Sequence, residues 1–514
     1  MLKNTLLELV SSSPGKKASE LVPLLPRSLG TVRRTDVNSV LYSMQNEGLV
    51  RKDESHCWWP IGDSVSGRRS SASNAPSAVR AESKPVIRGS ITLTDEQRRL
   101  VSIAPTGHTL IRGEPGSGKT TVLAHRAREF AANANAGSLL MLTYNAALAS
   151  YTRRLLLAMG HDDDAIITTL HKWASDAHHE MTGKRFAWVD SKQLTRIIDQ
   201  ALDGERTQSG DHRLLGLNAS FWSEEISWIY GQGIGSEEQY RNAARTGRGT
   251  AVPVRGDDRA IAWSVFERVH QALKSAGFVH MDNAVGPLLR AIRDANGQIM
   301  SGLQYDHVFI DEVQDFHPAW LMMMARIAKT SLTLAGDLGQ RIYRRNFAWK
   351  SVGINVVGRS YSLTGSFRTT REIMSVALGL LRDMELAKDT DWTPPSLPSR
   401  NGPKVKIVLR NREEELFEEA ANRCAGILKD HPSSSIVVAH HFNRPLDSIA
   451  GHIATRVPGT RKAKGNELGE MPPGVLVTTY FQLKGLEFDH VILLGLVDRL
   501  IPQWWVSKRD ESET

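Results

Sequence analysis

One glycine-rich stretch has the residue types and spacing needed to hold phosphate. It is GEPGSGKT, Gly113 to Thr120, between the apolar run HTLI and the helical pattern VLAHRAREFAA. Glycines permit a turn in which several backbone N–H groups converge on one phosphate, and the N-terminus of the next helix favours negative charge. Lys119 would reach the β- and γ-phosphates and the Thr120 hydroxyl would bind Mg²⁺, so we expect a nucleotide site and not a simple connection. The residues assigned to it are Gly113, Glu114, Pro115, Gly116, Ser117, Gly118, Lys119, Thr120 and Thr121.

A second candidate is the acidic pair Asp311 and Glu312, which ends the apolar run HVFI in YDHVFIDEVQDFHP. A buried strand delivers such residues to the edge of an α/β sheet, where ligands bind. Asp311 would hold Mg²⁺ and Glu312 would polarise the attacking water. The strand argues against the alternative, a pair of surface acids.

These groups need a sheet to position them. After residue 90, short β-rich segments alternate with helical patterns, which is the order of an α/β fold with parallel strands. We find no internal repeat in the sequence.

The sequence DEVQD narrows the class, because it resembles motif II of superfamily 1A helicases of the UvrD/Rep-like branch. Other motifs follow in that family's order between residues 92 and 505. They are LTDEQRRLV (Q motif), LMLTYNAALASYTRRLL (motif Ia), ITTLHKWA, LAGDLGQRIY (motif III), LTGSFRTTREI (motif IV) and VTTYFQLKGLEFDHVIL (motif V). The resemblance implies two RecA-like P-loop lobes with parallel sheets, ATP and Mg²⁺ as cofactors, and single-stranded DNA as the partner.

The resemblance also implies roles for individual residues. Gln97 would read the adenine edge, Phe367 would stack on the adenine, and Glu487 would bind the ribose. Arg368 would be an arginine finger, and Gln340 would link the γ-phosphate to the DNA groove.

Contacts to DNA are expected from Thr169, His171, Trp173 and Tyr343. Aromatic side chains stack on bases, while hydroxyls and cations bind backbone phosphates. Phe347, Arg344 and Arg345 extend this set. For each aromatic residue core packing is the alternative, and His171 has the alternative of a buried structural histidine.

The domain boundaries follow from these motifs and from composition. We expect a first lobe over 91–358 with a helical insert at about 174–300, and a second lobe over 359–514. The stretch GQGIG at 231–235 superficially suggests a dinucleotide loop, but it lacks a strand–helix context and is interpreted as a turn.

Residues 1–61 have the order of a winged helix-turn-helix, with three helical patterns followed by two short strands. Val37, Leu41 and Met44 form the apolar stripe of the third helix. Residues 1–90 carry 13 Lys/Arg and 8 Asp/Glu, and Arg33, Arg34, Arg51 and Lys52 flank the third helix and wing. Contact with nucleic acid is one interpretation, and contact with protein is the other. Residues 62–90 read as a flexible linker.

Several positions depart from the helicase pattern. Ser366 replaces an expected Asn, Arg341 a small residue and Phe481 a His, which affects coupling between the nucleotide and DNA sites. The stretch between motifs IV and V leaves little room for an accessory lobe. No VALTRA-like motif follows Glu487, so the tail IPQWWVSKRDESET, which begins near Pro502, reads as an interruption inside the second lobe.

Composition excludes some classes. Hydrophobic residues make up 41% and charged residues 23% of the 514 positions, and the net charge is +8. Two cysteines, Cys57 and Cys424, indicate neither a disulfide framework nor a cysteine zinc site. The N-terminus is a poor signal peptide and no apolar run reaches membrane-spanning length, so we expect a cytoplasmic protein.

The leading functional hypothesis is an ATP-dependent translocase or helicase on single-stranded DNA, 3′ to 5′ as the resemblance implies. RNA is not excluded by the motifs. One alternative is a nucleotide-gated DNA-binding or sensing subunit that works with a protein partner such as a nuclease. Another is a truncated helicase with weak ATPase activity.

Overall fold

The computed structural model describes residues 92–132, 137–159, 166–245, 252–295, 297–337, 349–382, 397–463 and 465–497, with shorter pieces between residues 2 and 60. The chain forms two compact units, residues 1–82 and 83–514. Of the predicted features, the linker at 62–90 and the tail from 498 lie outside the described residues.

The N-terminal unit has a small apolar core. Helix α1 (Leu2–Ser12), the 3-10 turn η1 (Val22–Leu24) and an antiparallel pair, β1 (Val50–Lys52) and β2 (Trp58–Pro60), surround it. The predicted stripe residues Val37, Leu41 and Met44 are fully buried, which confirms the face of the third helical segment. Arg33 and Arg34 lie outside the described residues, and the winged-helix assignment stays a prediction.

A six-stranded parallel sheet dominates the second unit. Its strands are β3 (Gly107–Gly113), β4 (Leu139–Thr143), β5 (Ile166–Thr169), β8 (Tyr305–Ile310), β9 (Ala328–Gly336) and β10 (Ser360–Leu363). Their order is β10-β3-β9-β8-β4-β5, and every neighbouring pair is parallel. This confirms the α/β fold class. Because β10 pairs with β3, the first lobe continues past the predicted boundary at residue 358.

Helices cover both faces of this sheet, which explains its continuous apolar strands. One face packs on α7 (Leu170–Thr182), α12 (Gly286–Asp294) and α13 (Pro318–Ile327). The other packs on α4 (Asp95–Val101), α5 (Lys119–Ala132) and α6 (Ala146–Ala158). Successive residues of β8 alternate between the two cores: Val308 and Ile310 face the first and Phe309 the second.

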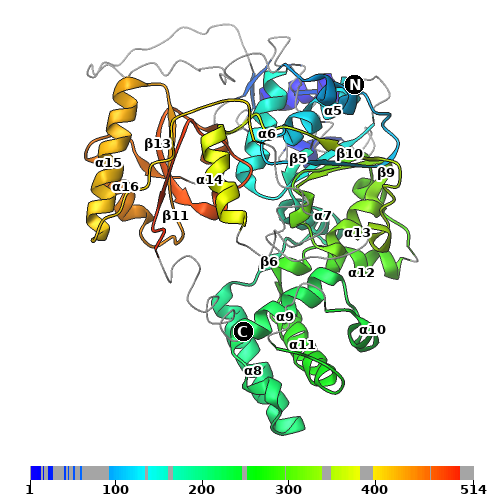
Figure 1. Ribbon diagram of the computed structural model, residues 1–514. Coiled ribbons are helices and arrows are strands. Elements are labelled where there is room, and N and C mark those ends of the chain that lie inside the picture. Colours follow the sequence, from blue (N-terminus) through cyan, green and yellow to red (C-terminus); the bar gives the residue numbers. More distant parts are fainter. Residues whose placement is uncertain are drawn as a thin grey trace, which may run out of the picture. The chain divides into compact units, whose positions relative to one another are not determined.

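The helical insert has a core of its own, built by α8 (Ser191–Ser209), α9 (Ala219–Gln232), α10 (Glu237–Asn242) and α11 (Asp258–Ser275), and these helices lie together in Figure 1. That core begins at Val189 and α7 belongs to the first lobe, so the insert starts later than predicted. The short parallel strands β6 (Ala187–Trp188) and β7 (Phe278–Val279) pair at its base.

Two glycines of GQGIG bring the insert close to the first lobe. A Cβ on Gly231 would lie 2.2 Å from Nδ1 of His317, and one on Gly233 would lie 2.9 Å from Cε of Met322. His317 Nε2 hydrogen bonds to Asp282 Oδ1 at 2.7 Å, and the Ser227 hydroxyl donates to the same carboxylate. The turn assigned to GQGIG therefore ends α9 against α13, which confirms that it is no nucleotide loop.

The second lobe contains a four-stranded parallel sheet in the order β12-β13-β11-β14. Its strands are β11 (Ser435–His440), β12 (Arg461–Lys462), β13 (Gly474–Thr479) and β14 (His490–Leu494). Helices α15 (Glu413–Asp430) and α16 (Leu446–Ala454) pack on one face. On the other face, α17 (Gly465–Glu470) and Ala147 of α6 cover β13 and part of β11.

The two sheets share a short sequence similarity that a search by sequence period does not reveal. Tyr305–Ile310 reads YDHVFI and Phe488–Leu493 reads FDHVIL. In the first lobe Ser138 donates its N–H (2.7 Å) and hydroxyl (2.9 Å) to Asp306, whose own N–H donates back at 3.1 Å. In the second, Ser435 and Asp489 make the same three bonds at 2.9, 2.9 and 3.2 Å. This similarity spans six residues and is no periodic repeat, so the expectation of no internal repeat stays as it was made.

No helix among the described residues is long and apolar enough to cross a membrane.

Candidate nucleotide site

The glycine-rich loop lies between β3 and α5, as predicted. Gly116 and Gly118 have φ values of +78° and +85°, a conformation that other residues rarely adopt. The Lys119 ammonium donates to the carbonyl oxygens of Gly113 (2.9 Å) and Glu114 (3.0 Å). The loop therefore holds its one cation over its own backbone, where phosphate oxygens would compete for the same donor.

Gln97 contacts the loop from α4. Thr94 caps that helix in a capping box with Gln97 as its third residue, which fixes the start of the helix. The Gln97 amide nitrogen donates to the Ser117 carbonyl at 3.0 Å, and a Cβ on Gly118 would lie 2.5 Å from that nitrogen. Gln97 therefore lies beside the loop. The helicase resemblance assigns its side chain to the adenine edge of the nucleotide.

Asp311 and Thr120 meet at the carboxyl end of β8. The Thr120 hydroxyl donates to Asp311 Oδ2 at 2.6 Å, and the Glu312 N–H donates to Oδ1 at 2.9 Å. Asp311 is fully buried. Burial and the neighbouring Glu312 carboxylate raise the pKa of Asp311 to about 6. A divalent cation favours the ionised carboxylate, so this pair of oxygens is suited to Mg²⁺.

Glu312 has an unusual backbone. Its φ is +53°, in the left-handed region that costs a non-glycine residue about 1–3 kcal/mol. The side chain of Gln314 donates to the Glu312 carboxylate, and its amide oxygen accepts from the Asp337 N–H at 3.1 Å. Gln314 thus links the acid of motif II to the start of motif III.

The segment after β10 packs directly on the loop. The Phe367 N–H donates to the Gly116 carbonyl at 2.9 Å, and the Phe367 side chain is 57% exposed. A Cβ on Gly116 would lie 2.7 Å from the Cβ of Arg368, so glycine is required for this approach. Two nearby hydroxyls, Ser117 Oγ and Ser366 Oγ, are buried without a hydrogen-bond partner among the described residues. Unsatisfied polar atoms beside an exposed aromatic ring are the features expected where a polar ligand with a planar base binds.

The second lobe reaches this site through motif V. Arg368 Nε donates to Glu487 Oε2 at 3.2 Å, and the Tyr151 hydroxyl of α6 lies 3.3 Å from Glu487 Oε1. Burial and Glu487 raise the pKa of Tyr151 to about 12. Arg368 and Glu487, which were assigned separate nucleotide contacts, are therefore adjacent.

A second link between the lobes joins motif II to motif V. Lys484 Nζ lies 2.6 Å from both carboxylate oxygens of Asp315, whose side chain is 1% exposed. Asn145, the N-cap of α6, donates to the Lys484 carbonyl at 3.2 Å. Motif II therefore contacts Thr120 through Asp311 at one end and the second lobe through Asp315 at the other.

Comparison with known families bears on this arrangement. Residues 93–351 match the model of the UvrD/REP helicase N-terminal domain, which covers about half of the chain. The chain belongs to the UvrD/REP helicase family. No curated protein matches it. Membership supports a DNA helicase-like function with ATP binding.

In this UvrD/REP-family chain the expected DNA contacts divide into three groups. Thr169 caps α7 by accepting from the Lys172 N–H at 3.4 Å and is half-buried. Trp173 is 3% exposed and its indole N–H donates to the Tyr305 hydroxyl at 3.3 Å. A buried indole cannot stack on a base, so its assignment to DNA is contradicted in favour of core packing. Gln340 and Tyr343, with Arg341, Arg344, Arg345 and Phe347, lie outside the described residues.

His171 also fits the structural alternative. Its ring makes edge contacts with Trp188 and Trp320, at centroid distances of 5.6 and 5.1 Å. Burial lowers the pKa of His171, which favours the neutral form of the ring inside this aromatic cluster. This packing does not support a strand contact by His171.

Sequence reasoning missed Gln314, Asp315 and Lys484, although all three lie inside quoted motifs. The available signal was the opposite charge of Asp315 and Lys484 in two motifs expected to face each other. It also missed Tyr151, for which we find no signal beyond its place in motif Ia.

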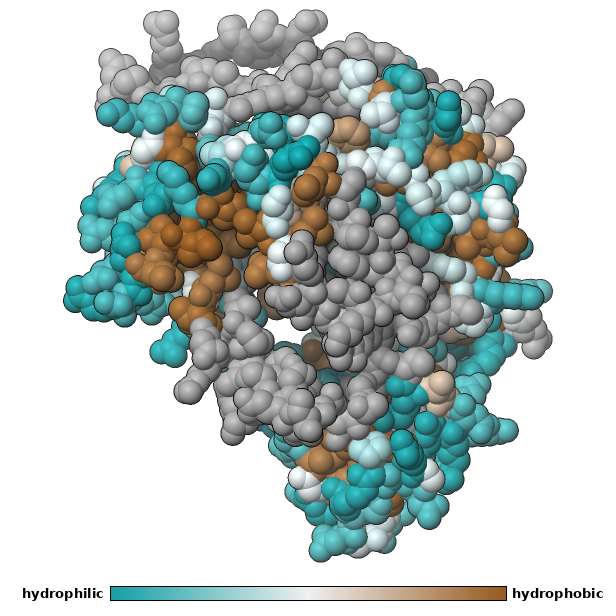
Figure 2. All heavy atoms as spheres, viewed as in Figure 1, coloured by the Kyte–Doolittle hydropathy of each residue, from teal (hydrophilic) through white to brown (hydrophobic). Residues whose placement is uncertain are grey.

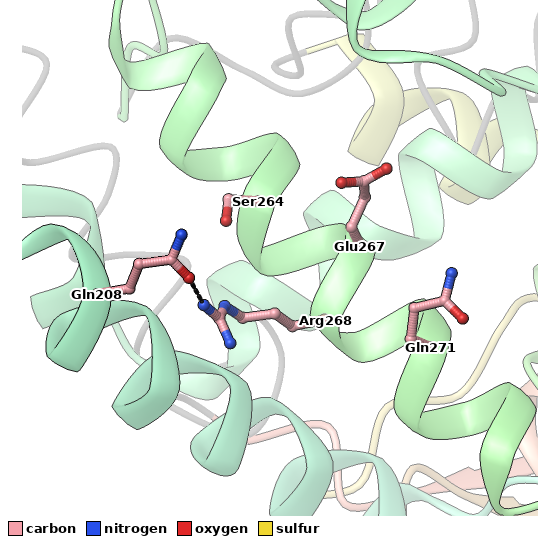
Figure 3. Close-up of a pocket in the computed structure, with 5 residues that line it drawn as sticks. All are labelled: Gln208, Ser264, Glu267, Arg268 and Gln271. Carbon is pink, nitrogen blue, oxygen red and sulfur yellow. Dashed lines mark hydrogen bonds between the residues drawn. The ribbon is translucent and has the colours of Figure 1, made fainter.

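A hollow of about 500 Å³ lies away from the loop, between α8 and α11 of the insert (Figure 3). It is lined by Gln208, Ser264, Glu267, Arg268 and Gln271. Arg268 donates to Gln208 and, at 2.8 Å, to the buried Glu205. The Arg268 guanidinium in this hollow is therefore already paired, and the hollow does not compare with the glycine-rich loop as a ligand site.

Proposed function

We propose that the chain is an ATP-driven motor that moves along single-stranded DNA and separates strands in the 3′ to 5′ direction. Family membership supports the helicase class, and hydrolysis, translocation and direction are the proposal. The observation that carries it is the pair of contacts that motif V of the second lobe makes, Lys484 to Asp315 of motif II and Glu487 to Arg368 beside the nucleotide loop. A motor of two lobes needs its nucleotide to be sensed from both sides.

In this proposal the loop amides and Lys119 bind the phosphates, while Gln97 and Phe367 hold the base. Thr120 and Asp311 would hold Mg²⁺, which neutralises charge on the phosphates when it is bound. Among the described residues no group of three or more His, Cys, Asp or Glu could bind a metal. This fits an ion held jointly by two side-chain oxygens and the nucleotide.

Hydrolysis then requires a water aligned on the γ-phosphorus. Glu312 accepts its proton as the new P–O bond forms and the bond to the β–γ bridging oxygen breaks, so that ADP and phosphate leave. Arg368 would leave Glu487 to stabilise charge on the γ-phosphate, while Glu487 turns to the ribose. An arginine in this role accelerates phosphoryl transfer by about 10³–10⁵-fold.

Movement would follow from the change in these contacts. Closing of the lobes brings Arg368 to the nucleotide, and product release lets the lobes separate. The Lys484–Asp315 ion pair would couple this motion to motif II. Gln314, which bonds to both Glu312 and Asp337, would couple motif II to motif III. Each ATP consumed would drive one cycle of lobe closure and opening, and the DNA strand would advance by one step in each cycle.

The test is ATPase activity with and without single-stranded DNA. We expect DNA to stimulate turnover and Lys119→Ala to abolish it, with Lys172→Ala, an exposed lysine in an ion pair on α7, as the matched control. Equal turnover with and without DNA would contradict a translocase. A strand-displacement assay on a duplex with a 3′ single-stranded tail then tests unwinding and direction.

The second candidate is a nucleotide-gated DNA-binding subunit that acts with another protein. The observation that favours it is that the second lobe exposes large apolar side chains, among them Ile407, Leu409, Val491 and Leu493. Figure 2 shows brown side chains gathered over the second lobe. Robust strand separation by the chain alone would exclude it. Nucleotide-dependent DNA binding without unwinding would favour it over the motor.

A further inference from the structure

One buried arginine lies about two helical turns after Lys119 in α5 and takes no part in the function proposed above. Arg126 is 0% exposed and is among the largest fully buried side chains of the described residues. Burial lowers the pKa of Arg126 to about 10, so the guanidinium stays charged at neutral pH. Because a buried charge is costly unless it is paired or hydrogen bonded, its partners indicate what it stabilises.

The partners of Arg126 are backbone carbonyl groups at the C-terminal end of α4. Its Nη1 donates to the carbonyl oxygens of Leu100 (2.5 Å), Val101 (3.0 Å) and Ile103 (3.0 Å). Its Nε and Nη2 have no hydrogen-bond partner among the described residues. The guanidinium carbon lies 4.9 Å from the centre of the Phe130 ring. Among the described residues the charge is therefore directed at the end of α4 and not at a carboxylate.

These bonds complete the C-terminal end of α4. The last carbonyl groups of a helix lack partners within the helix itself. The Ser102 hydroxyl donates to the Arg99 carbonyl at 3.1 Å, and Arg126 supplies the donor for the two carbonyls that follow. A cation at this end also complements the helix dipole. Arg126 thus stabilises α4 both by hydrogen bonds and by charge.

Helix α4 is short, and it carries the residue assigned to the base of the nucleotide. It has seven residues, and a helix of this length is not stable by itself in water. Gln97 lies one turn before Val101. Its amide nitrogen donates to the Ser117 carbonyl of the loop, and its amide oxygen accepts from the Thr94 N–H at 3.0 Å. The position of this amide therefore depends on how the helix is held.

The same helix also contacts the segment that carries Phe367. The Glu96 carboxylate accepts from the Thr364 N–H at 3.1 Å and from the Thr364 hydroxyl at 3.2 Å. Thr364 precedes Phe367 by three positions. Both residues assigned to the base, Gln97 and Phe367, are therefore connected to α4.

We infer that Arg126 is a positioning residue for base recognition: by holding the C-terminal end of α4, it fixes Gln97 beside the nucleotide loop and makes the site selective for adenine. The inference deepens the function proposed above and rests on its nucleotide site. Arg126 does not touch the nucleotide in this account and acts only through α4.

A role in stability alone is the alternative. Leu100 and Val101 pack in the same apolar core as α5, and Arg126 could simply fill space there. An apolar side chain would fill that space without the cost of burying a charge. The charge and its three carbonyl partners favour a role in holding the helix end. Because the core also holds α4, loss of Arg126 should weaken adenine selectivity without abolishing ATP binding.

The test compares equilibrium binding of ATP and of GTP to the full chain by isothermal titration calorimetry. In Arg126→Met we expect the affinity for ATP to fall about tenfold and that for GTP to change by about twofold at most, because contacts to the base are weakened. Arg126→Lys keeps a cation with three donors and should lose about threefold for ATP. Arg128→Met, at an exposed position of the same helix, is the control and should bind both nucleotides like the unchanged chain.

Amide hydrogen exchange tests the contact with α4 in the absence of nucleotide. In Arg126→Met the amides of α4 should exchange about tenfold faster, whereas those of β8 and β9 should be unchanged. Arg126→Lys should give the same pattern with a smaller change, which keeps the test valid if the methionine variant does not fold. Equally faster exchange in α4 and in both strands would show a role in stability alone and would overturn the inference.

A double variant tests whether Arg126 acts through Gln97. When Gln97→Ala is already present, Arg126→Met should change the ratio of ATP to GTP affinity by about twofold at most. An equal change with and without Gln97 would overturn the inference, as would unchanged selectivity in a folded Arg126 variant. Failure of the unchanged chain to bind ATP would contradict the nucleotide site itself and is seen without any variant, so the two failures are distinguishable.

Discussion

Strands β8 and β14 begin with the same clamp between a serine and an aspartate, yet their surroundings differ. Val308 and Ile310 of β8 are fully buried, while Val491 and Leu493, at the equivalent positions, are about half exposed. The difference comes from neighbours, because β8 pairs with a strand on both sides and β14 pairs with only one strand among the described residues. Local sequence therefore sets how a strand begins, and the number of strands beside it sets how much of it is buried.

The lobes also differ in how they are supported. The first lobe covers its own sheet with helices on both faces. The second relies partly on α6 of the first lobe, which packs close to Gly469 and Gly485. A Cβ on Gly469 would lie 2.3 Å from the Ala147 carbonyl oxygen. The second lobe is thus the less independent of the two, and variants can test each form of dependence.

The largest expected effect concerns chemistry supplied at the junction of the lobes. Arg368→Ala should lower the ATPase rate constant at saturating ATP by about 10³-fold, because it removes the proposed arginine finger. Arg371→Ala, an exposed neighbour, is the control and should be unchanged. A loss of less than tenfold in Arg368→Ala would mean that another group acts as the finger.

A smaller effect concerns the ion pair between the lobes. Lys484→Ala removes the cation paired with the buried Asp315 carboxylate and should cost about 3–5 kcal/mol. Adding Asp315→Asn to that variant should restore part of the loss, because the buried negative charge is removed. Urea unfolding of both single variants and the double variant measures the coupling. Additive losses would contradict a direct interaction.

The smallest effects concern the two clamps. Hydrogen bonds from the Ser138 N–H outweigh burial, and with the Ser138 hydroxyl and Lys329 they lower the pKa of Asp306. A carboxylate with a lowered pKa stabilises the folded state above its unfolded pKa of about 3.9, and this is lost as pH falls through the folded value. Asp306→Asn should therefore cost about 1–2 kcal/mol at pH 7 and progressively less below about pH 4.

Asp489→Asn is the matched variant in the second lobe. Because β14 is an edge strand, we expect a smaller change in urea unfolding and a faster local amide exchange in β14. Equal losses of unfolding free energy at pH 7 would show that β14 is as central to stability as β8.

Much of the nucleotide site followed from sequence because its parts are local. The spacing from Gly113 to Thr120 fixes the loop, and an apolar strand delivers Asp311 to it. The α/β class followed from alternating strand and helix patterns. Gln97 was assigned through the resemblance of LTDEQRRLV to the Q motif, and the structure places it as the third residue of a capped helix.

Other features depend on packing that spacing does not encode. Trp173 has an aromatic side chain that could stack on a base, but the spacing of apolar residues in α7 did not show that it faces the core. Lys484 and Asp315 lie 169 positions apart, so only the folded chain brings them together. The similarity of β8 and β14 became visible through shared hydrogen bonds, because six residues carry too little sequence signal.

The missing side chain at Gly231 has a consequence for how the insert is mounted. Because Gly231 has no side chain, α9 can approach His317 closely. The tilt of the insert therefore depends on the absence of a Cβ atom at this position. Glycine, alanine and valine at position 231 would place side chains of increasing size between α9 and His317. Such a series would vary the angle between the insert and the first lobe in steps.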